Sequence, residues 1–571
     1  MAVRSSWSPM SDPNPVLCGF RTPEPGRPGV VAPEAVPPAL NQEGARMLIP
    51  APVHISGHRG CLLVRDGDRI QAPPGLADQV DAFIADLAAD GGPALVKEGS
   101  GRAAITVHIG APMDVARAVP AAVGIDPTGR TATDARYALR VAPDGIAIRA
   151  ADPAGVSHAF ATLRQLVAGA PIDAEGCREV AGVRIVDGPR LAWRAFLLDV
   201  ARCYYTLDEI FAIVDVIALY KLNVLQLHLA DNEAWRIEMP GYAALTAGGE
   251  PFYSRAEMER LRDYCAARGI TLLLEIDLPG HCIALLRAYP EWGRIEERQG
   301  RFVGQVDPGS PELWVFVEAV LRELSDIAGS PHVGLCCDEA FRMDPAVYSS
   351  FVRRVSHVAR ARGVSLVLAQ EATRAVLEPG SIVELWIDFV GPGGDLEKLE
   401  RLAAAGEPLP HDMPPATLPF YRVAAGDVQR AVAQGCRVVL APTRVAYLDT
   451  PYADVSLDAD QEGRRGALGL PVYSARSVQE FYEWEPETII PGLDGASVAG
   501  VKAAMWADTV SDAATMRLLS VTRIPGFAER AWSPRESGAW EDFAPRLGAQ
   551  SRIWDRRALG YFRAATVPWA L

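Results

Sequence analysis

The sequence predicts an α/β fold, a (β/α)8 barrel (TIM barrel) over residues 186–571, preceded by a small α/β domain over residues 47–185. Eight short apolar runs, mostly separated by segments of helical spacing, lie between residues 195 and 531, and eight is the strand count of such a barrel. The runs are nearly continuous in apolar residues, as expected for strands covered on both faces. A doubly wound open sheet is the competing arrangement, but no G-x-G-x-x-G motif follows any of these runs.

The N-terminal part of the chain changes character at about residue 47. Nine of the first 38 residues are proline, a density that cannot form a core, so residues 1–46 are expected to be a flexible leader. The small domain is expected to contain a helix, a strand, a hairpin around a Pro-Asp-Gly turn and a second helix, at 77–90, 103–111, 137–150 and 152–167. Asp152 is a suitable cap for the second helix, and Pro153 suits its first position.

The barrel segments follow in a regular order. The expected strands are 195–200, 223–229, 271–276, 333–337, 364–369, 381–386, 437–442 and 501–506. The expected helices are 206–221, 254–269, 311–329, 344–363, 423–435 and a last one near 511–531. Gly269 closes one of these helical segments, as is typical of a helix C-terminus.

Composition narrows the class of partner. The net charge of −15 argues against a nucleic-acid binder, which needs a basic face, and is compatible with a neutral sugar. No run of 18 apolar residues predicts a membrane span, and the N-terminus lacks the apolar region of a secretory signal, so a cytoplasmic location is expected. Nine cysteines in so long a chain do not indicate a disulfide scaffold. No metal or organic cofactor is expected, and the oligomeric state is left open.

Two adjacent carboxylates end one of the apolar runs. In HVGLCCDEA (332–340), Asp338 and Glu339 follow a buried run with no Lys or Arg beside them. The pair alone is not diagnostic, because Asp208 and Glu209 form a second one in what is expected to be the first turn of a helix. Its position is informative, because the chemistry of a (β/α)8 barrel lies at the carboxyl ends of its strands.

The other strand ends carry residues of related chemistry. They are Asp199, Arg202, His228, Asp231, Glu275, Asp277, His281, Gln370, Glu371, Trp386, Tyr447, Asp449, Trp506 and Asp508. Carboxylates bind hydroxyls and transfer protons, and aromatic rings cover the C–H faces of sugars, so the set indicates a carbohydrate site. Neighbouring side chains diverge, so Glu339 is expected to reach the leaving oxygen as a general acid while Asp338 stays ionised beneath the sugar.

Each of these residues also has a purely structural interpretation. A single Asp after a strand is often a helix cap, Asp199 and Glu275 could brace the barrel, and His228 could be a hydrogen-bonded core residue. Trp386 and Trp506 could belong to the core. For any one residue the alternatives stay open, and the convergence of the whole set on one mouth favours a site.

Longer motifs carry a family resemblance. They are WRAFLLDVARCYY (193–205), IALYKLNVLQLHLADNEAWRIEMPGY (217–242) and GITLLLEIDLPGHCIALLRAYPEW (269–292), with the shorter CCDEA, AYLDTPY, AAMWAD and FAERAWSP. In order and spacing the chain resembles the family 20 glycoside hydrolases, the β-N-acetylhexosaminidases, over about residues 47 to 571. The domain before the barrel is also similar to the one that precedes the barrel in this family.

The resemblance implies an exo-acting, retaining hydrolase in which the 2-acetamido oxygen of the substrate, a terminal N-acetylglucosamine or N-acetylgalactosamine type of residue, attacks C1. Glu339 resembles the acid that protonates the leaving group, and Asp338 the residue that orients the acetamide and stabilises the oxazolinium ion. The other counterparts implied by the resemblance are Tyr447 for the acetamide carbonyl, Arg194 for the outer hydroxyls, Asp231 and His281 as support for the acid, Trp386 and Trp506 as pocket walls, and Asp508 for the far hydroxyls.

The chain departs from the family pattern at four places. Residues 334–337 read Gly-Leu-Cys-Cys where the family has His-x-Gly-Gly, Ala369 and Gln370 stand where a tryptophan is usual, and Asp508 replaces Glu. Residues 390–420 are expected to form a long excursion near the mouth. The exact sugar, linkage and aglycone therefore stay open. Two other hypotheses remain: a glycosidase of altered specificity with an enzyme carboxylate as nucleophile, either Glu371 or Asp508, and a catalytically silent sugar-binding barrel.

Overall fold

The computed structural model describes residues 47–100, 102–110, 113–130, 133–298, 301–341, 343–388, 395–409, 415–536 and 538–570. The proline-rich leader predicted for residues 1–46 lies outside the described residues. Two structural regions follow one another along the described chain, a domain built on an open sheet and a barrel with its helices.

The first region contains a six-stranded sheet in the order β1-β6-β4-β5-β3-β2. Its strands are β1 (His54–Val64), β2 (Arg69–Gln71), β3 (Ala103–Ile109), β4 (Tyr137–Ala142), β5 (Gly145–Ala150) and β6 (Arg178–Asp187). Strands β4 and β5 pair antiparallel up to Ala142 and Gly145, so the predicted hairpin is confirmed. Strand β6 runs two residues beyond the boundary predicted at residue 185.

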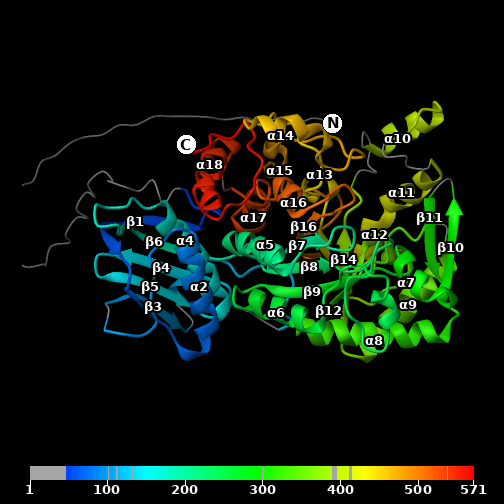
Figure 1. Ribbon diagram of the computed structural model, residues 1–571, viewed down its shortest axis with the longest axis horizontal. Helices are drawn as coiled ribbons and strands as arrows, with labels where there is room; N and C mark the ends of the chain where they lie inside the picture. Colours follow the sequence, from blue (N-terminus) through cyan, green and yellow to red (C-terminus); the bar gives the residue numbers. More distant parts are fainter. Residues whose placement is uncertain are drawn as a thin grey trace, which may run out of the picture. The chain divides into compact units, whose positions relative to one another are not determined.

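Helices α2 (Ala77–Ala89) and α4 (Pro153–Gly169) pack beside this sheet, and α4 also contacts barrel helix α5 (Leu207–Leu219) (Figure 1). Helix α4 begins as the sequence predicts: the side chain of Asp152 accepts a hydrogen bond from the backbone N–H of Ala154, and Pro153 occupies the first turn. Most of α4 is buried, because it has the sheet on one side and the barrel on the other.

The second region is a closed barrel of eight parallel strands, which confirms the predicted fold class. Its strands are β7 (Trp193–Asp199), β8 (Val224–His228), β9 (Thr271–Ile276), β12 (His332–Leu335), β13 (Ser365–Ala369), β14 (Ile382–Leu385), β15 (Arg437–Leu440) and β16 (Val498–Met505). Each corresponds to one of the eight predicted runs. Strand β12 ends at Leu335, so Cys336 and Cys337 already belong to the loop that carries the acid pair.

The barrel helices agree with the predicted segments except in two places. Matching helices are α5, α6 (Arg255–Ala266), α8 (Pro311–Ala328), α9 (Pro345–Ala361), α12 (Asp427–Ala433), α16 (Ala513–Ser520) and α17 (Ile524–Trp532). The segment 511–531 is thus two helices. The segment 423–435 starts at Val423, the last residue of a preceding helix, continues through a 3-10 turn (Ala424–Gly426) and enters α12 at Asp427. Asp208 and Glu209 lie in the first turn of α5, as expected, and Glu209 forms a capping box with Thr206.

Further elements were not predicted as separate units; the first of them lies in the sheet domain and the others lie around the barrel. They are α3 (Met113–Ala118), α7 (Ile283–Ala288), the hairpin of β10 (Gly293–Arg298) and β11 (Arg301–Val306), α10 (Asp395–Ala404), α11 (Leu418–Val423), α13 (Thr443–Ala446), α14 (Ala459–Arg464), α15 (Val478–Tyr482) and α18 (Trp540–Arg556). Several of them follow the carboxyl ends of barrel strands, where they add side chains to the mouth.

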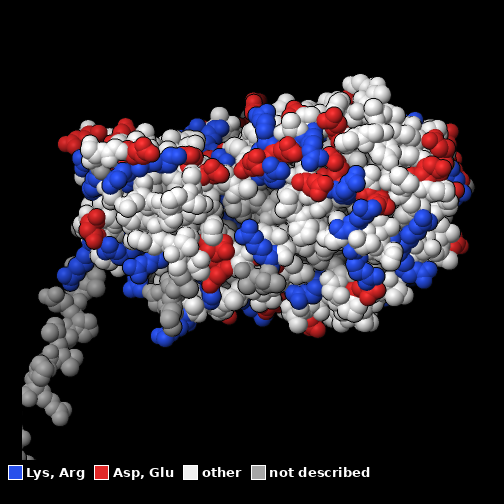
Figure 2. Space-filling view, turned by 90° about the horizontal axis from the view of Figure 1, so that it is seen from below, with Lys and Arg blue, Asp and Glu red and all other residues white. Residues whose placement is uncertain are grey.

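Surface charge is mixed on the face shown in Figure 2. Acidic and basic side chains alternate over this face, and the part of the described chain that is visible there has no continuous basic band. Among the described helices, none combines the length and the apolar character needed to cross a membrane.

Candidate active site

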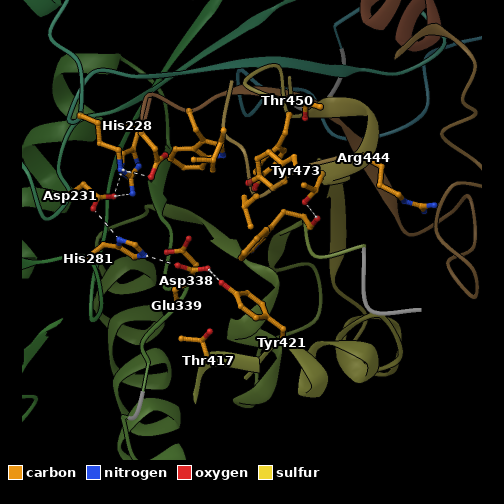
Figure 3. A pocket seen from close by; sticks show the side chains of 18 of the residues that line it. His228, Asp231, His281, Asp338, Glu339, Thr417, Tyr421, Arg444, Thr450 and Tyr473 are labelled. Atoms are coloured by element: carbon orange, nitrogen blue, oxygen red, sulfur yellow. Dashed lines mark hydrogen bonds and ion pairs between the residues drawn. The ribbon is translucent and has the colours of Figure 1, made fainter. Parts of the chain in front are cut away.

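One cavity at the carboxyl ends of the strands collects most of the predicted site residues (Figure 3). It is lined by Arg202, His228, Asp231, Asp277, His281, Asp338, Glu339, Phe341, Trp386, Leu399, Thr417, Tyr421, Thr443, Arg444, Tyr447, Thr450, Leu470, Val472, Tyr473, Ser474, Arg476, Trp506 and Asp508. Every residue predicted to be catalytic or to bind substrate lies in this set except Arg194.

The loop that carries the acid pair and the neighbouring loop after β9 both have an unusual backbone. Cys337, Glu339 and His281 have positive φ angles of 61°, 39° and 44°, and they are three of the five non-glycine residues with positive φ in the described chain. Such angles cost roughly 1–3 kcal/mol each and persist where surrounding contacts enforce them. Gly280, in the loop after β9, permits the close approach of this loop to the acid pair, since a Cβ on Gly280 would lie 3.0 Å from the carbonyl oxygen of Asp338.

Asp338 is a half-buried carboxylate with a protonated neighbour. Burial and the charge of Asp338 raise the pKa of Asp277 well above its usual range, so Asp277 keeps its proton and donates it in a hydrogen bond to Asp338. Burial would raise the pKa of Asp338, but this hydrogen bond and the charge of His281 outweigh it, so the pKa is lowered. Oδ1 of Asp338 has no hydrogen-bond partner among the described residues. An ionised oxygen is therefore available to a ligand.

Glu339 has both carboxylate oxygens engaged. Oε2 lies 3.3 Å from Nε2 of His281, and Oε1 accepts a hydrogen bond of 2.5 Å from the hydroxyl of Tyr421. Nδ1 of His281 lies 3.0 Å from Oδ1 of Asp231. Burial would lower the pKa of His281, but Asp231 and Glu339 raise it well above its usual range, so both ring nitrogens carry protons. The imidazolium thus bridges the two acids, as the dashed lines in Figure 3 show.

A buried polar chain continues this arrangement into the barrel. His228 lies 3.0 Å from Asp231 through Nε2 and 2.9 Å from Glu275 through Nδ1. Burial opposes protonation, but these two carboxylates raise the pKa of His228 to about 10. Glu275 accepts a further hydrogen bond of 2.6 Å from Gln226, and Gly334 leaves room for it, because a Cβ on Gly334 would come within 2.6 Å of Glu275. Glu275 thus holds His228 in place, and His228 is hydrogen-bonded on both ring nitrogens, as one of the interpretations left open by the sequence has it.

The arginine of the site is Arg202, and the expectation for Arg194 requires correction. Arg194 is the second residue of β7 and lies at the amino end of the barrel, where its guanidinium donates to the backbone oxygens of Lys221, Leu191 and Ala192. Arg202 follows the carboxyl end of β7 and lies 2.8 Å from Asp231 and 3.7 Å from Asp508. A residue at the start of the strand cannot reach the mouth, because a strand advances about 3.3 Å per residue and five further residues of β7 follow Arg194.

Aromatic rings form the cavity wall. The ring centroid of Tyr447 lies 6.2 Å from Trp386, 6.3 Å from Trp506 and 5.9 Å from Tyr473. Close by, Asp449 is 1% exposed, and neither of its carboxylate oxygens has a hydrogen-bond partner among the described residues. Burial and the charge of Asp508 raise the pKa of Asp449 well above its usual range. Asp449 does not itself line the cavity, and protonation lowers the cost of burying its carboxyl group without partners.

Two overlapping groups of potential metal ligands share Cys336. The ligand atoms of His228, Glu275 and Cys336 lie within 4.8 Å of one another, and so do those of Asp277, Cys336 and Asp338. Both ring nitrogens of His228 already face carboxylates, and Asp338 accepts the proton of Asp277. Hydrogen bonds therefore account for these groups.

Comparison with known proteins identifies the family. The profile of the glycosyl hydrolase family 20 catalytic domain matches residues 191–535, and that of domain 2 of the same family matches residues 45–188. The chain belongs to glycosyl hydrolase family 20. It is therefore a glycoside hydrolase, as the resemblance in the sequence implies.

Individual family 20 members agree with this assignment. A β-N-acetylhexosaminidase of Cellulomonas fimi is 31% identical over 77% of this chain and 82% of its own length. A β-hexosaminidase of Akkermansia muciniphila is 28% identical over 73% of this chain and 82% of its own. Among solved structures, the N-acetyl-β-hexosaminidase of Streptomyces plicatus in complex with thio-NAglucal has a TM-score of 0.74 at 27% identity, covering 92% of this chain and 98% of that one.

The departures from the family 20 pattern have clear positions in the structure. Ala369 is buried at the end of β13. Two residues further along the chain, Glu371 accepts a hydrogen bond of 3.2 Å from the indole N–H of Trp386. The excursion predicted for residues 390–420 contributes α10 and leads into α11, which places Tyr421 against Glu339. Residues 389–394 and 410–414 of this segment lie outside the described residues. Tyr421 and Tyr473 were not predicted, because both come from connections without a strand signal.

Proposed function

We propose that the protein is an exo-acting, retaining β-N-acetylhexosaminidase that removes terminal N-acetylglucosamine or N-acetylgalactosamine residues by substrate-assisted catalysis. The main observation in support of the proposal is that two adjacent carboxylates have different hydrogen-bond and ion-pair partners. Asp338 is held ionised with one oxygen unpartnered, while Glu339 lies at the cavity wall between His281 and Tyr421. The hexosaminidase names of the similar proteins support this sugar class.

In the first step, Glu339 gives its proton to the glycosidic oxygen while the acetamide oxygen of the substrate attacks C1. The bond from C1 to the leaving group breaks, and an oxazolinium ion forms. The unpartnered oxygen of Asp338 accepts the acetamide N–H and stabilises the positive charge. An intramolecular nucleophile is already close to C1, so the protein only has to position it and stabilise the charge.

In the second step, Glu339 acts as a base. Its carboxylate takes a proton from a water molecule, the water oxygen attacks C1, and the bond from C1 to the acetamide oxygen breaks. Two displacements at C1 return the sugar with its original configuration. The ion pair with His281 keeps the carboxylate in place between the two steps.

The remaining cavity residues are assigned to substrate binding. Tyr447 is positioned to donate to the acetamide carbonyl, with Trp386 and Trp506 as walls beside it. Arg202 takes the role that the sequence resemblance gave to Arg194, and it binds the outer hydroxyls together with Asp508.

An enzyme carboxylate as nucleophile is less well supported. Burial and the charge of Asp338 raise the pKa of Glu371 to about 8, so Glu371 is largely protonated at neutral pH and is a poor nucleophile. Glu371 is also absent from the cavity lining, whereas Asp508 faces Arg202. The acetamide of the substrate is the better candidate.

Hydrolysis of an aryl β-N-acetylglucosaminide, with a thiazoline analogue of the oxazolinium ion as inhibitor, tests the proposal. We expect turnover that the thiazoline blocks, a loss on the order of 10²-fold or more in Asp338→Asn, and loss of most turnover of unactivated substrates in Glu339→Gln. Exposed Glu378→Gln serves as the control. A trapped glycosyl-enzyme would support a carboxylate nucleophile, binding without turnover a silent barrel, and full activity of Asp338→Asn would refute the assisted mechanism.

A further inference from the structure

Tyr421 reaches the proposed acid from a separate part of the molecule. It belongs to α11, in the long connection between β14 and β15, whereas Glu339 follows β12. Its hydroxyl donates a hydrogen bond of 2.5 Å to Oε1 of Glu339. The side chain of Tyr421 is buried, with only 6% of its surface exposed. Burial and the charge of Glu339 raise the pKa of Tyr421 well above its usual range, so the phenol remains a hydrogen-bond donor throughout the working pH range.

The connection that carries Tyr421 has its own small core. We call its described part, residues 395–409 and 415–426, the cap segment. Its buried apolar side chains join Ile387, which follows β14, in a cluster distinct from the main barrel core; those from the cap segment are Leu396, Leu399, Leu409, Leu418, Tyr421 and Ala424. The ring of Tyr421 also lies 6.1 Å from Phe341 and 6.4 Å from Trp386. Packing on these sides holds the phenol in place, so its contact with Glu339 is built into the fold.

The cap segment forms one wall of the cavity on the Glu339 side. Leu399, Thr417 and Tyr421 come from the cap segment and line the cavity together with Phe341, which follows Glu339 by two residues. Figure 3 shows Thr417 and Tyr421 on the same side of the cavity as Glu339, whereas Thr450 and Tyr473 lie farther away. Apart from the two hydroxyls, this wall presents apolar carbon to whatever binds next to the acid.

From this arrangement we propose that the cap segment forms the binding site for the leaving group and that Tyr421 is a positioning residue that couples this site to Glu339. The inference rests on the proposed role of Glu339 as proton donor. When Glu339 gives its proton to the glycosidic oxygen it becomes a carboxylate, and the hydrogen bond from Tyr421 stabilises that charge. His281 holds the other oxygen, so the two partners fix the plane of the carboxyl group. The site suits leaving groups that present an apolar face.

Replacing Tyr421 by Phe removes one hydroxyl and keeps the ring. We expect kcat/KM for methyl or phenyl β-N-acetylglucosaminide to fall roughly 10-fold or more, the scale of one hydrogen bond to a charged group. The 2,4-dinitrophenyl glycoside needs little protonation, so its kcat/KM should change by less than about threefold. The basic limb of the kcat/KM–pH profile for the phenyl glycoside should move to higher pH, because the ionised carboxylate loses a donor.

Two controls keep the interpretation specific. Tyr264→Phe removes another phenol-to-carboxylate hydrogen bond, that of 2.7 Å to Asp215, away from the cavity, and should leave all three rates unchanged. Leu399→Ala keeps the Tyr421 hydroxyl and should lower the preference for the phenyl over the methyl glycoside. Thiazoline affinity, measured by calorimetry on each variant, shows that the sugar site is intact and the protein folded.

The outcomes separate this inference from the proposed function. Wild-type protein that hydrolyses neither the dinitrophenyl nor the phenyl glycoside contradicts the function itself. Wild-type turnover with equal losses on the phenyl and dinitrophenyl glycosides in Tyr421→Phe, or with no loss and no movement of the pH profile, overturns the inference alone. If Leu399→Ala keeps the wild-type preference for the phenyl over the methyl glycoside, the cap segment is not the leaving-group site, even if Tyr421→Phe behaves as expected.

Discussion

At the scale of single residues, the site keeps neighbouring carboxyl groups in different protonation states. Asp277 is buried and Asp338 is half-buried, and the pKa of the first is raised while that of the second is lowered, because one shared proton lies between them. Asp277 also accepts a hydrogen bond of 3.2 Å from the backbone N–H of Cys337. It therefore acts as a neutral donor toward Asp338 and an acceptor toward the loop.

Asparagine is the closest mimic of a protonated Asp277. In Asp277→Asn the amide nitrogen can donate to Asp338 and the amide oxygen can accept from Cys337, so we expect kcat to fall less than about 10-fold. Asp277→Ala removes both contacts and should cost on the order of 10²-fold, the scale of one preorganised contact. Steady-state kinetics of the two variants on the aryl glycoside provide the measurement. If Asn proves as damaging as Ala, Asp277 is ionised and the assignment of the proton is wrong.

The protonation state of the buried Glu371 makes the stability of the fold depend on pH. Its pKa is raised to about 8 by burial and the charge of Asp338, from 4.5 when unfolded. The folded state therefore holds a proton that the unfolded state has lost, so stability is lost as pH rises from about 4.5 through about 8. In Glu371→Gln this loss disappears. We expect the variant to gain on the order of a few kcal/mol relative to wild type between pH 5 and pH 9.

Denaturant unfolding at pH 5, 7 and 9 measures this difference. Glu378→Gln, a change at an exposed glutamate seven residues along the chain, should run parallel to wild type over the same range. Parallel curves for Glu371→Gln and wild type would mean that Glu371 is already ionised in the folded protein.

At the scale of elements, the loop after β12 is shaped by its contact with the loop after β9. Gly280 sits against Asp338 and Ala340, and a Cβ there would lie 3.0 Å from the oxygen of one and 3.3 Å from Cα of the other. Gly280→Ala should therefore move the acid pair by a few tenths of an ångström, and we expect kcat to fall roughly 10–100-fold, because small displacements of catalytic groups are costly.

Gly248 provides the matched control for this change. A Cβ on Gly248 would meet no atom within 4 Å, so Gly248→Ala should keep wild-type kinetics. The thermal midpoint of each variant separates displacement of the loop from unfolding. Unchanged kcat in Gly280→Ala would show that the two loops yield without disturbing Asp338 and Glu339.

The sequence predicts strands better than it predicts what the connections contribute. All eight barrel runs were identified, because strands buried on both faces require uninterrupted apolar residues. The segment 511–531 was predicted as one helix, but Pro525 lacks a backbone N–H and fits best in the first turn of a new helix, which is where α17 places it. Tyr421 could not be predicted, because its approach to Glu339 depends on packing between distant segments.

The arginine of the site shows what strand polarity adds to motif matching. Arg194 and Arg202 both lie in the same motif, and the resemblance was assigned to Arg194. The closed parallel barrel favours Arg202, because the first residues of a strand and the residues after its end lie at opposite ends of the barrel. The same rule favours Arg202 from the sequence alone, because Arg202 is one of the residues that follow a predicted strand.

At the scale of the whole molecule, a buried ion pair ties the first domain to the barrel. Nζ of Lys221, after α5, lies 2.9 Å from Oδ2 of Asp187 at the end of β6. Asp187 also accepts hydrogen bonds from the hydroxyl of Tyr137 and the indole N–H of Trp532. Trp532 comes from α17 of the barrel and packs into the core of the first domain. The interface thus combines apolar burial with ion pairs, namely this fully enclosed pair and the contacts of Asp86 with Arg268 and of Asp90 with Arg557.

Removing one partner of such a pair is more costly than removing both. Lys221→Met leaves Asp187 as a buried carboxylate with only neutral donors, so we expect the free energy of unfolding to fall by about 3–5 kcal/mol. The double variant Lys221→Met, Asp187→Asn contains no isolated charge and should recover part of this loss. Denaturant unfolding of the wild type, both single variants and the double variant gives the coupling directly. Losses that simply add in the double variant would mean that the two charges are independent, and that apolar packing around Trp532 joins the domain to the barrel without help from the pair.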